Sequence, residues 1–214
     1  MAKLKDLINV FESKEMYETL INIMKRYPTE FVIQGFITLL PERLNDGQEY
    51  RSSILKCIGL MINCDQGQEM ADKRNLVLDL VCLLLNENDE EIITNTILAL
   101  KNCLISSKSK WQCKELWHKM CLVLISKMFT KTNMLMQMYS IQALRILSDM
   151  PTVKEFLNKR CKEKLKKVTC LSHEVEFLKT DLMMWLKYKN YKESDTTEHQ
   201  RAEINALPFE YLDK

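Results

Sequence analysis

Glycine and proline are scarce in this sequence, with only four of each among 214 residues. A β-rich fold of this length needs many tight turns, which these two residues favour. Their scarcity argues against a sheet-based architecture. Apolar residues instead recur at three- and four-residue steps in most segments, as amphipathic helices require. The sequence therefore predicts an all-α chain.

Long apolar runs and an excess of one charge are also missing. No stretch approaches the roughly 18 apolar residues of a membrane span, and residues 1–10 lack the apolar run of a secretory signal. We expect a protein that binds no membrane, is cytoplasmic or nuclear, and keeps its eight cysteines reduced. The net charge of +2 favours no partner class over the whole surface.

Motifs for catalysis, cofactors and metals are absent. The sequence contains no GxGxxG, GK[ST], GxSxG or HExxH pattern and only three histidines. Two clusters of cysteine and histidine lack the paired CxxC spacing of a zinc site; they are Cys113, His118 and Cys121, and Cys161, Cys170 and His173. Cys113 and His118 are five residues apart, which places them on different faces of a helix. We expect no enzyme activity, no cofactor and no metal.

Helices are predicted in the segments between polar or proline-containing breaks. The first includes Leu4 to Phe11, the next Leu20 to Met24, and another begins at Pro28. The later ones are expected at 49–63, 69–85, 90–106, 111–129, 134–148, 152–167 and 172–188. Asn45, Asp46 and Gly47 predict a turn.

A small residue followed by a large one recurs in these helices. The pairs are Gly59–Leu60, Ala99–Leu100 and Ala143–Leu144, with a weaker copy at Met184. Positions 60, 100, 144 and 184 are separated by 40, 44 and 40 residues. A small residue at this period lets one helix approach the next, while its large neighbour fills the core between units.

This spacing and the segment ILALKNCL resemble armadillo and HEAT-type repeats. The resemblance implies a right-handed α-solenoid. Residues 1–48 would form N-terminal capping helices, 49–190 the repeats of the same continuous domain, and 191–214 a tail. In the central repeat, 88–95 would form the short second helix and 97–105 the third helix, which lines the concave surface.

Proteins of this class bind other proteins along stacked helices, so the resemblance implies a protein-interaction adaptor or scaffold. Asn102 matches the asparagine with which peptide-binding members hold a peptide backbone. Leu98 stands where those members have tryptophan, and the aligned positions are Ile62, Ile146 and Leu186. Because no asparagine ladder exists, we expect an apolar groove that receives a partner helix or peptide.

The expected partner-binding residues lie on the third helices, and they are Met61, Lys101, Asn102, Arg145 and Trp185. Tryptophan and arginine are the residues most enriched in binding hot spots. The alternative is that Trp185 closes the last repeat and that the two cations are only solvated. An exposed end of a solenoid could also form a homo-oligomer.

A basic patch follows in the segment NKRCKEKLKK, and its residues are Lys159, Arg160, Lys162, Lys164, Lys166 and Lys167. On a regular helix, Lys159, Lys162 and Lys166 share one face. The patch could bind nucleic acid or an acidic partner, act as a nuclear localisation signal, or be a solvated face. A nucleic-acid-associated helical repeat is thus the alternative function.

The tail changes character after Tyr191. A polar linker precedes a segment with five large apolar side chains in nine residues, which are Ile204, Leu207, Phe209, Tyr211 and Leu212. Pro208 prevents a continuous helix through them. The segment is predicted either to cap the array or to be a docking motif for another chain.

Overall fold

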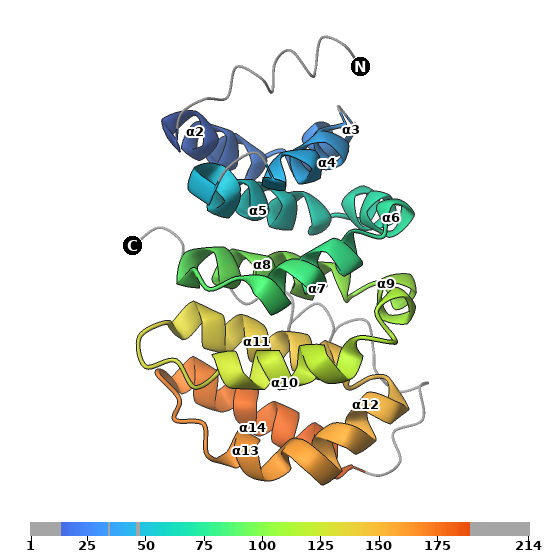
Figure 1. Ribbon diagram of the computed structural model, residues 1–214, viewed down its shortest axis with the longest axis vertical. Helices are drawn as coiled ribbons and strands as arrows, with labels where there is room; N and C mark the ends of the chain where they lie inside the picture. The colour runs from blue at the N-terminus through green and yellow to red at the C-terminus, as the bar shows by residue number, and fades with distance from the viewer. Residues whose placement is uncertain (1–13, 34, 46–47, 189–214) are drawn as a thin grey trace.

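The computed structural model describes residues 14–33, 35–45 and 48–188, and all regular structure in these ranges is helical (Figure 1). The predicted all-α class is confirmed. The N-terminal elements are α2 (Lys14–Met24), α3 (Pro28–Ile33), α4 (Phe36–Leu39) and the 3-10 helix η1 (Leu40–Asn45). They are followed by α5 (Gln48–Ile62), α6 (Asp65–Arg74), α7 (Leu76–Asn86), α8 (Glu90–Cys103), α9 (Ser107–Gln112), α10 (Trp117–Lys127) and α11 (Met134–Leu147). The C-terminal elements are α12 (Pro151–Phe156), the π-helix η2 (Leu157–Cys161), α13 (Lys162–Lys166) and α14 (His173–Lys187).

Five of these helices form a column in which each packs on the next, in the order α2, α5, α8, α11 and α14 (Figure 1). Alongside the column, α7 packs on α8, and α10 packs on both α11 and α7. The short helices α6 and α9 lie at one edge of the stack in Figure 1. One hydrophobic core runs from Tyr17 in α2 to Leu186 in α14.

Side-chain caps fix where three column helices begin. The Oδ1 atom of Asp89 accepts from the N–H of Ile92 at 2.9 Å at the start of α8. Asn133 caps α11 in the same way through the N–H of Met136, at 2.8 Å. The Oγ atom of Ser172 accepts from Val175 at the start of α14. Each cap pairs an N–H group that has no partner within its own helix.

The predicted close approach of neighbouring helices occurs between α5 and α8. A Cβ atom added to Gly59 would lie 3.6 Å from the Cα atom of Ala99. Gly59, Ala99 and Ala143 are all buried. Met184 does not fit the pattern, because its side chain is 47% exposed on α14. The small-large pairing therefore describes α5, α8 and α11 but not α14.

Two predicted helices are each broken in the structure. The segment 69–85 is divided between α6 and α7 at Asn75, whose φ of 56° lies in the left-handed region that asparagine tolerates. The segment 111–129 is divided between α9 and α10 by the turn at 113–116. α9 is held to α6 instead, because the Asp72 carboxylate accepts hydrogen bonds from Ser106 and Ser109.

The predicted division of the central unit is also wrong. Residues 88–95 do not form a separate helix, because α8 runs without a break from Glu90 to Cys103. The preceding helix is α7, which ends at Asn86. The expected helix at 152–167 is helical as far as Lys166 but includes the π-helix η2.

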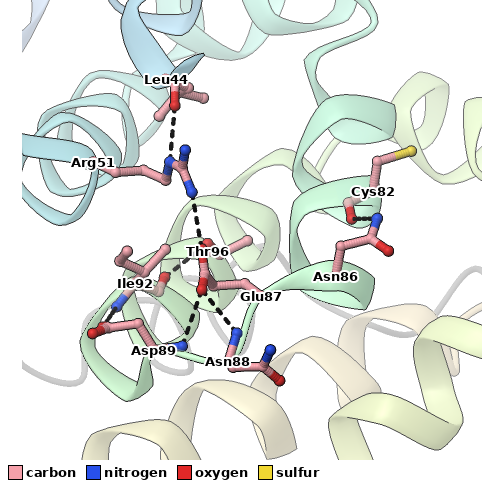
Figure 2. Close-up of polar contacts among 9 residues, drawn as sticks. All are labelled: Leu44, Arg51, Cys82, Asn86, Glu87, Asn88, Asp89, Ile92 and Thr96. Carbon is pink, nitrogen blue, oxygen red and sulfur yellow. Dashed lines mark hydrogen bonds and ion pairs between the residues drawn. The ribbon is translucent and has the colours of Figure 1, made fainter. Parts of the chain in front are cut away.

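Polar contacts fix the loop before α8 (Figure 2). The Oε1 atom of Glu87 accepts from the N–H groups of Asn88 and Asp89, at 2.8 and 3.0 Å. Its Oε2 atom lies 3.1 Å from the guanidinium of Arg51, which also donates to the main-chain oxygen of Leu44. The Asp89 N–H and the Arg51 charge lower the pKa of Glu87 despite the opposing effect of burial. Arg51 thus connects η1, α5 and the α7–α8 loop.

Candidate partner-binding site

The five predicted partner-binding residues do not share one surface. Met61 and Asn102 are fully buried, and Lys101 is only 7% exposed. Arg145 and Trp185 are partly exposed. The expectation that Met61, Lys101 and Asn102 contact a partner is therefore wrong for this structure, because neighbouring helices cover these side chains.

Asn102 stabilises the column itself. Its Nδ2 atom donates to the main-chain oxygen of Gly59 at 2.8 Å, which joins α8 to α5. Lys101 lies in the interior of the stack beside α11, with its ammonium 5.8 Å from the ring centroid of Tyr139. No ion pair among the described residues includes Lys101. Burial lowers its pKa to about 8.

Arg145 and Trp185 belong to a mixed group that we call the Trp185 cluster. Its members are Lys110, Arg145, Asp149, Lys154, Asp181 and Trp185, which come from α9, α11, α12, α14 and the turn after α11. The Arg145 guanidinium lies 3.9 Å from the centroid of the Trp185 ring. It also pairs with Asp149 at 3.1 Å and with Asp181 at 3.4 Å. Cation–π attraction and the two ion pairs hold the guanidinium on the ring.

Asp149 and Trp185 are each held from a second direction. The ammonium of Lys110 lies 3.0 Å from Asp149, so α9 is tied to the end of α11. The indole N–H of Trp185 donates to the main-chain oxygen of Ser148 at 3.4 Å. These contacts fix the orientation of the ring at the surface. The reading that the two cations are merely solvated is wrong for Arg145, whose side chain is 14% exposed and is paired on two sides.

Lys154 is the member of the cluster without a carboxylate partner. Its ammonium lies 4.0 Å from the Trp185 ring centroid, and no ion pair among residues 14–33, 35–45 and 48–188 includes it. Desolvation and the nearby charge of Arg145 lower the pKa of Lys154, while Asp149 opposes this shift. Three cations thus share two carboxylates, which makes the cluster a surface that can accept a further carboxylate.

Four members of this cluster were not predicted from the sequence. Lys110 and Lys154 have no helical spacing to Arg145 or Trp185 that would relate them. Asp181 was detectable, because it stands four residues before Trp185 in one helix. Asp149 was detectable, because it stands four residues after Arg145 in a helical segment and such pairs meet on one face.

The basic patch lies on η2, α13 and the residue after α13. Five of its six side chains are exposed, and that of Lys162 is partly exposed. Lys159 pairs with Glu155, and Lys166 pairs with Glu163. The π-helix changes the rotation per residue between Leu157 and Cys161. The regular helical spacing that predicted one shared face for Lys159, Lys162 and Lys166 therefore does not apply across η2.

The cysteines show no sign of a metal site. No group of three or more potential metal ligands occurs among the described residues. All eight cysteines are free, and burial raises the pKa of the Cys57 thiol to about 12 and that of Cys113 to about 11. His118 is exposed and stacks on Trp117 with ring centroids 3.4 Å apart.

No helix in the described part of the chain is both long and apolar enough to cross a bilayer. The five apolar residues predicted to cap the array or to dock another chain, 204–212, lie outside the described residues. The sequence matches no protein-family model, and no curated protein is significantly similar to it.

Proposed function

We propose that this chain is a right-handed α-solenoid of armadillo/HEAT-like repeats that acts as a non-enzymatic protein-interaction adaptor. The stacked column supports this architecture, since α5, α8 and α11 pack in sequence order with a second row of helices beside them. Long stacks of this kind present extended surfaces to other proteins. The partner is a helix or peptide that docks against the Trp185 cluster.

One observation carries the proposal: Lys154 and Arg145 lie 4.0 and 3.9 Å from the ring of a partly exposed tryptophan, and Lys154 has no carboxylate partner in the described ranges. Tryptophan and arginine are enriched among binding hot spots. An acidic side chain beside an apolar one fits this surface, because the carboxylate would pair with Lys154 while the apolar group contacts the indole.

The test compares charge reversals at matched positions. Lys154→Glu places an acidic group at the ring, whereas Lys119→Glu makes the same charge change at an exposed site on α10. Both variants and the wild type would be used as baits for affinity capture followed by mass spectrometry. We expect a partner that the wild type and Lys119→Glu retain and that Lys154→Glu loses.

A second pair of variants tests the aromatic ring. Trp185→Ala removes the ring of the cluster, and Trp111→Ala removes a ring that is 67% exposed on α9. Circular dichroism and thermal melting would show that each variant is folded. If both variants capture the same partners as the wild type, the Trp185 cluster is not the docking surface.

Nucleic-acid binding through the basic patch is the second candidate. Exposure of five basic side chains favours it, since only Lys159 and Lys166 have acidic partners among the described residues. Phosphate contacts release counterions, so binding would weaken steeply with salt. Measuring RNA and DNA affinity at several salt concentrations, with Lys162→Glu/Lys164→Glu as the variant, distinguishes this function from protein docking.

A further inference from the structure

The last helix of the column carries an apolar stripe on its outer side. Val175, Leu178, Leu182 and Leu186 are the buried residues of α14. Phe177, Met184 and Tyr188 point elsewhere and are 68%, 47% and 59% exposed. At about 100° per residue these three positions lie within about 40° of one another around the helix axis. We call them the α14 stripe.

The described part of the chain leaves this stripe uncovered. α14 packs on α11 and η2, and no element of the column follows it (Figure 1). The stripe is about 16 Å long, because it spans eleven residues at 1.5 Å each. Three large apolar side chains on one line at the end of a stack are a surface that another apolar segment can cover.

The composition of the chain after α14 points to the segment that covers it. We propose that residues 204–212 of the same chain fold back and pack their apolar side chains on the α14 stripe. This segment has five large apolar residues in nine positions, the highest density in the chain after Tyr188. It is tethered to α14, so it needs no encounter with a second molecule.

The reach of the connection permits this contact. Residues 189–203 form a polar connection of fifteen residues, which spans at most about 50 Å when extended. That length exceeds the 16 Å stripe about threefold. A tether of this size gives a local concentration in the millimolar range, so even a weak apolar contact forms within the chain.

Photo-crosslinking in the full chain tests the contact directly. Phe177 would be replaced by benzoylphenylalanine, and the irradiated protein would be digested and analysed by mass spectrometry. We expect the main cross-link to join position 177 to residues 204–212 within one chain. Trp111, which is 67% exposed against 68% for Phe177, provides a matched control on α9 that should give no such product. Cross-links between two copies, or none to 204–212, would overturn the proposal.

Hydrogen exchange of the full chain gives an independent readout. If the segment is bound about nine-tenths of the time, its amides exchange about tenfold more slowly than when it is free. We expect Phe177→Asp to remove this protection from residues 204–212, and Trp111→Asp to leave it unchanged. Phe209→Asp changes the segment instead of the stripe, and it should remove the same protection from exchange. Equal exchange of 204–212 in all four proteins would overturn the proposal.

Discussion

Replacing Gln137 with leucine tests whether one buried amide holds two loops together. Gln137 is fully buried in α11. Its Nε2 atom donates to the main-chain oxygens of Met128 at 2.8 Å and Thr169 at 2.9 Å. Its Oε1 atom accepts from the N–H of Leu171 at 3.0 Å. The side chain therefore connects the loop before α11 with the loop before α14.

The magnitude follows from the groups that leucine would leave unpaired. The main-chain oxygens of Met128 and Thr169 and the N–H of Leu171 lose their closest partner, as does the more distant oxygen of Thr130 at 3.4 Å. Each buried unpaired group costs about 1 kcal/mol or more. Leucine has nearly the same volume, so little cavity is created. We expect Gln137→Leu to lower the free energy of unfolding by about 3 kcal/mol. In a chain of this size, that corresponds to a melting temperature lower by about 6–12 °C.

Gln142 provides the matched control for this change. It lies in the same helix, is 2% exposed, and has no hydrogen-bond partner for its Oε1 atom among the described residues. We expect Gln142→Leu to be neutral or stabilising. Thermal melts followed by circular dichroism would compare both variants with the wild type. Equal losses for the two variants would refute the reasoning, because the cost would then come from side-chain shape rather than from hydrogen bonding.

Three further predictions concern a glycine, a buried cation and a thiol. A Cβ atom at Gly67 would overlap the main-chain oxygen of Met61, so Gly67→Ala should lower the free energy of unfolding by about 1–3 kcal/mol in urea titrations. Gly59→Ala, with no contact shorter than 3.3 Å, should cost less. Burial lowers the pKa of Lys101 from 10.5 to about 8, so Lys101→Met should raise the free energy of unfolding at pH 7 by as much as about 3 kcal/mol. The Lys101 ammonium keeps its proton to higher pH in the unfolded chain than in the folded one. The free energy of unfolding of the wild type should therefore rise relative to that of Lys101→Met between pH 8 and 10.5. If the difference between the two proteins did not change with pH, this assignment would be contradicted. Cys82 is the one exposed cysteine, so a thiol reagent should label one site rapidly in the folded wild type and none in Cys82→Ser.

Much of the column could be predicted because its helix starts are encoded locally. Asp89, Asn133 and Ser172 each stand directly before an apolar pattern of helical period, and each caps a helix in the structure. The break at Asn75 was missed although the sequence carries a signal for it. Four polar residues, Asp72 to Asn75, interrupt the apolar pattern, and an asparagine directly after basic residues is typical of a helix end. Periodicity reports which positions are buried but not where a chain turns between two buried segments.

The site was harder to predict than the fold because a helical period does not tell which neighbour a face meets. Aligning the repeated pairs placed Met61, Lys101, Arg145 and Trp185 in one column, yet the structure buries the first two and exposes part of the last two. The end of the stack accounts for Trp185, because no column helix follows α14. It does not account for Arg145, because α11 is covered by both α8 and α14. Position along the array, which no local pattern contains, therefore decides the exposure of the last member of the aligned set.

Asn102 bears on the proposal that a partner docks at the Trp185 cluster rather than along the whole column. An amide on this helix is well suited to bind a main-chain carbonyl, and the resemblance to peptide-binding repeats assigns that carbonyl to a bound peptide. Here the carbonyl belongs to Gly59 in the last turn of α5, where main-chain oxygens lack donors from a following turn. Releasing Asn102 to a peptide would leave that buried oxygen unpaired, at a cost of about 1–3 kcal/mol. The same chemistry is therefore already used within the fold, which is why we propose docking where Lys154 and Trp185 reach the surface instead.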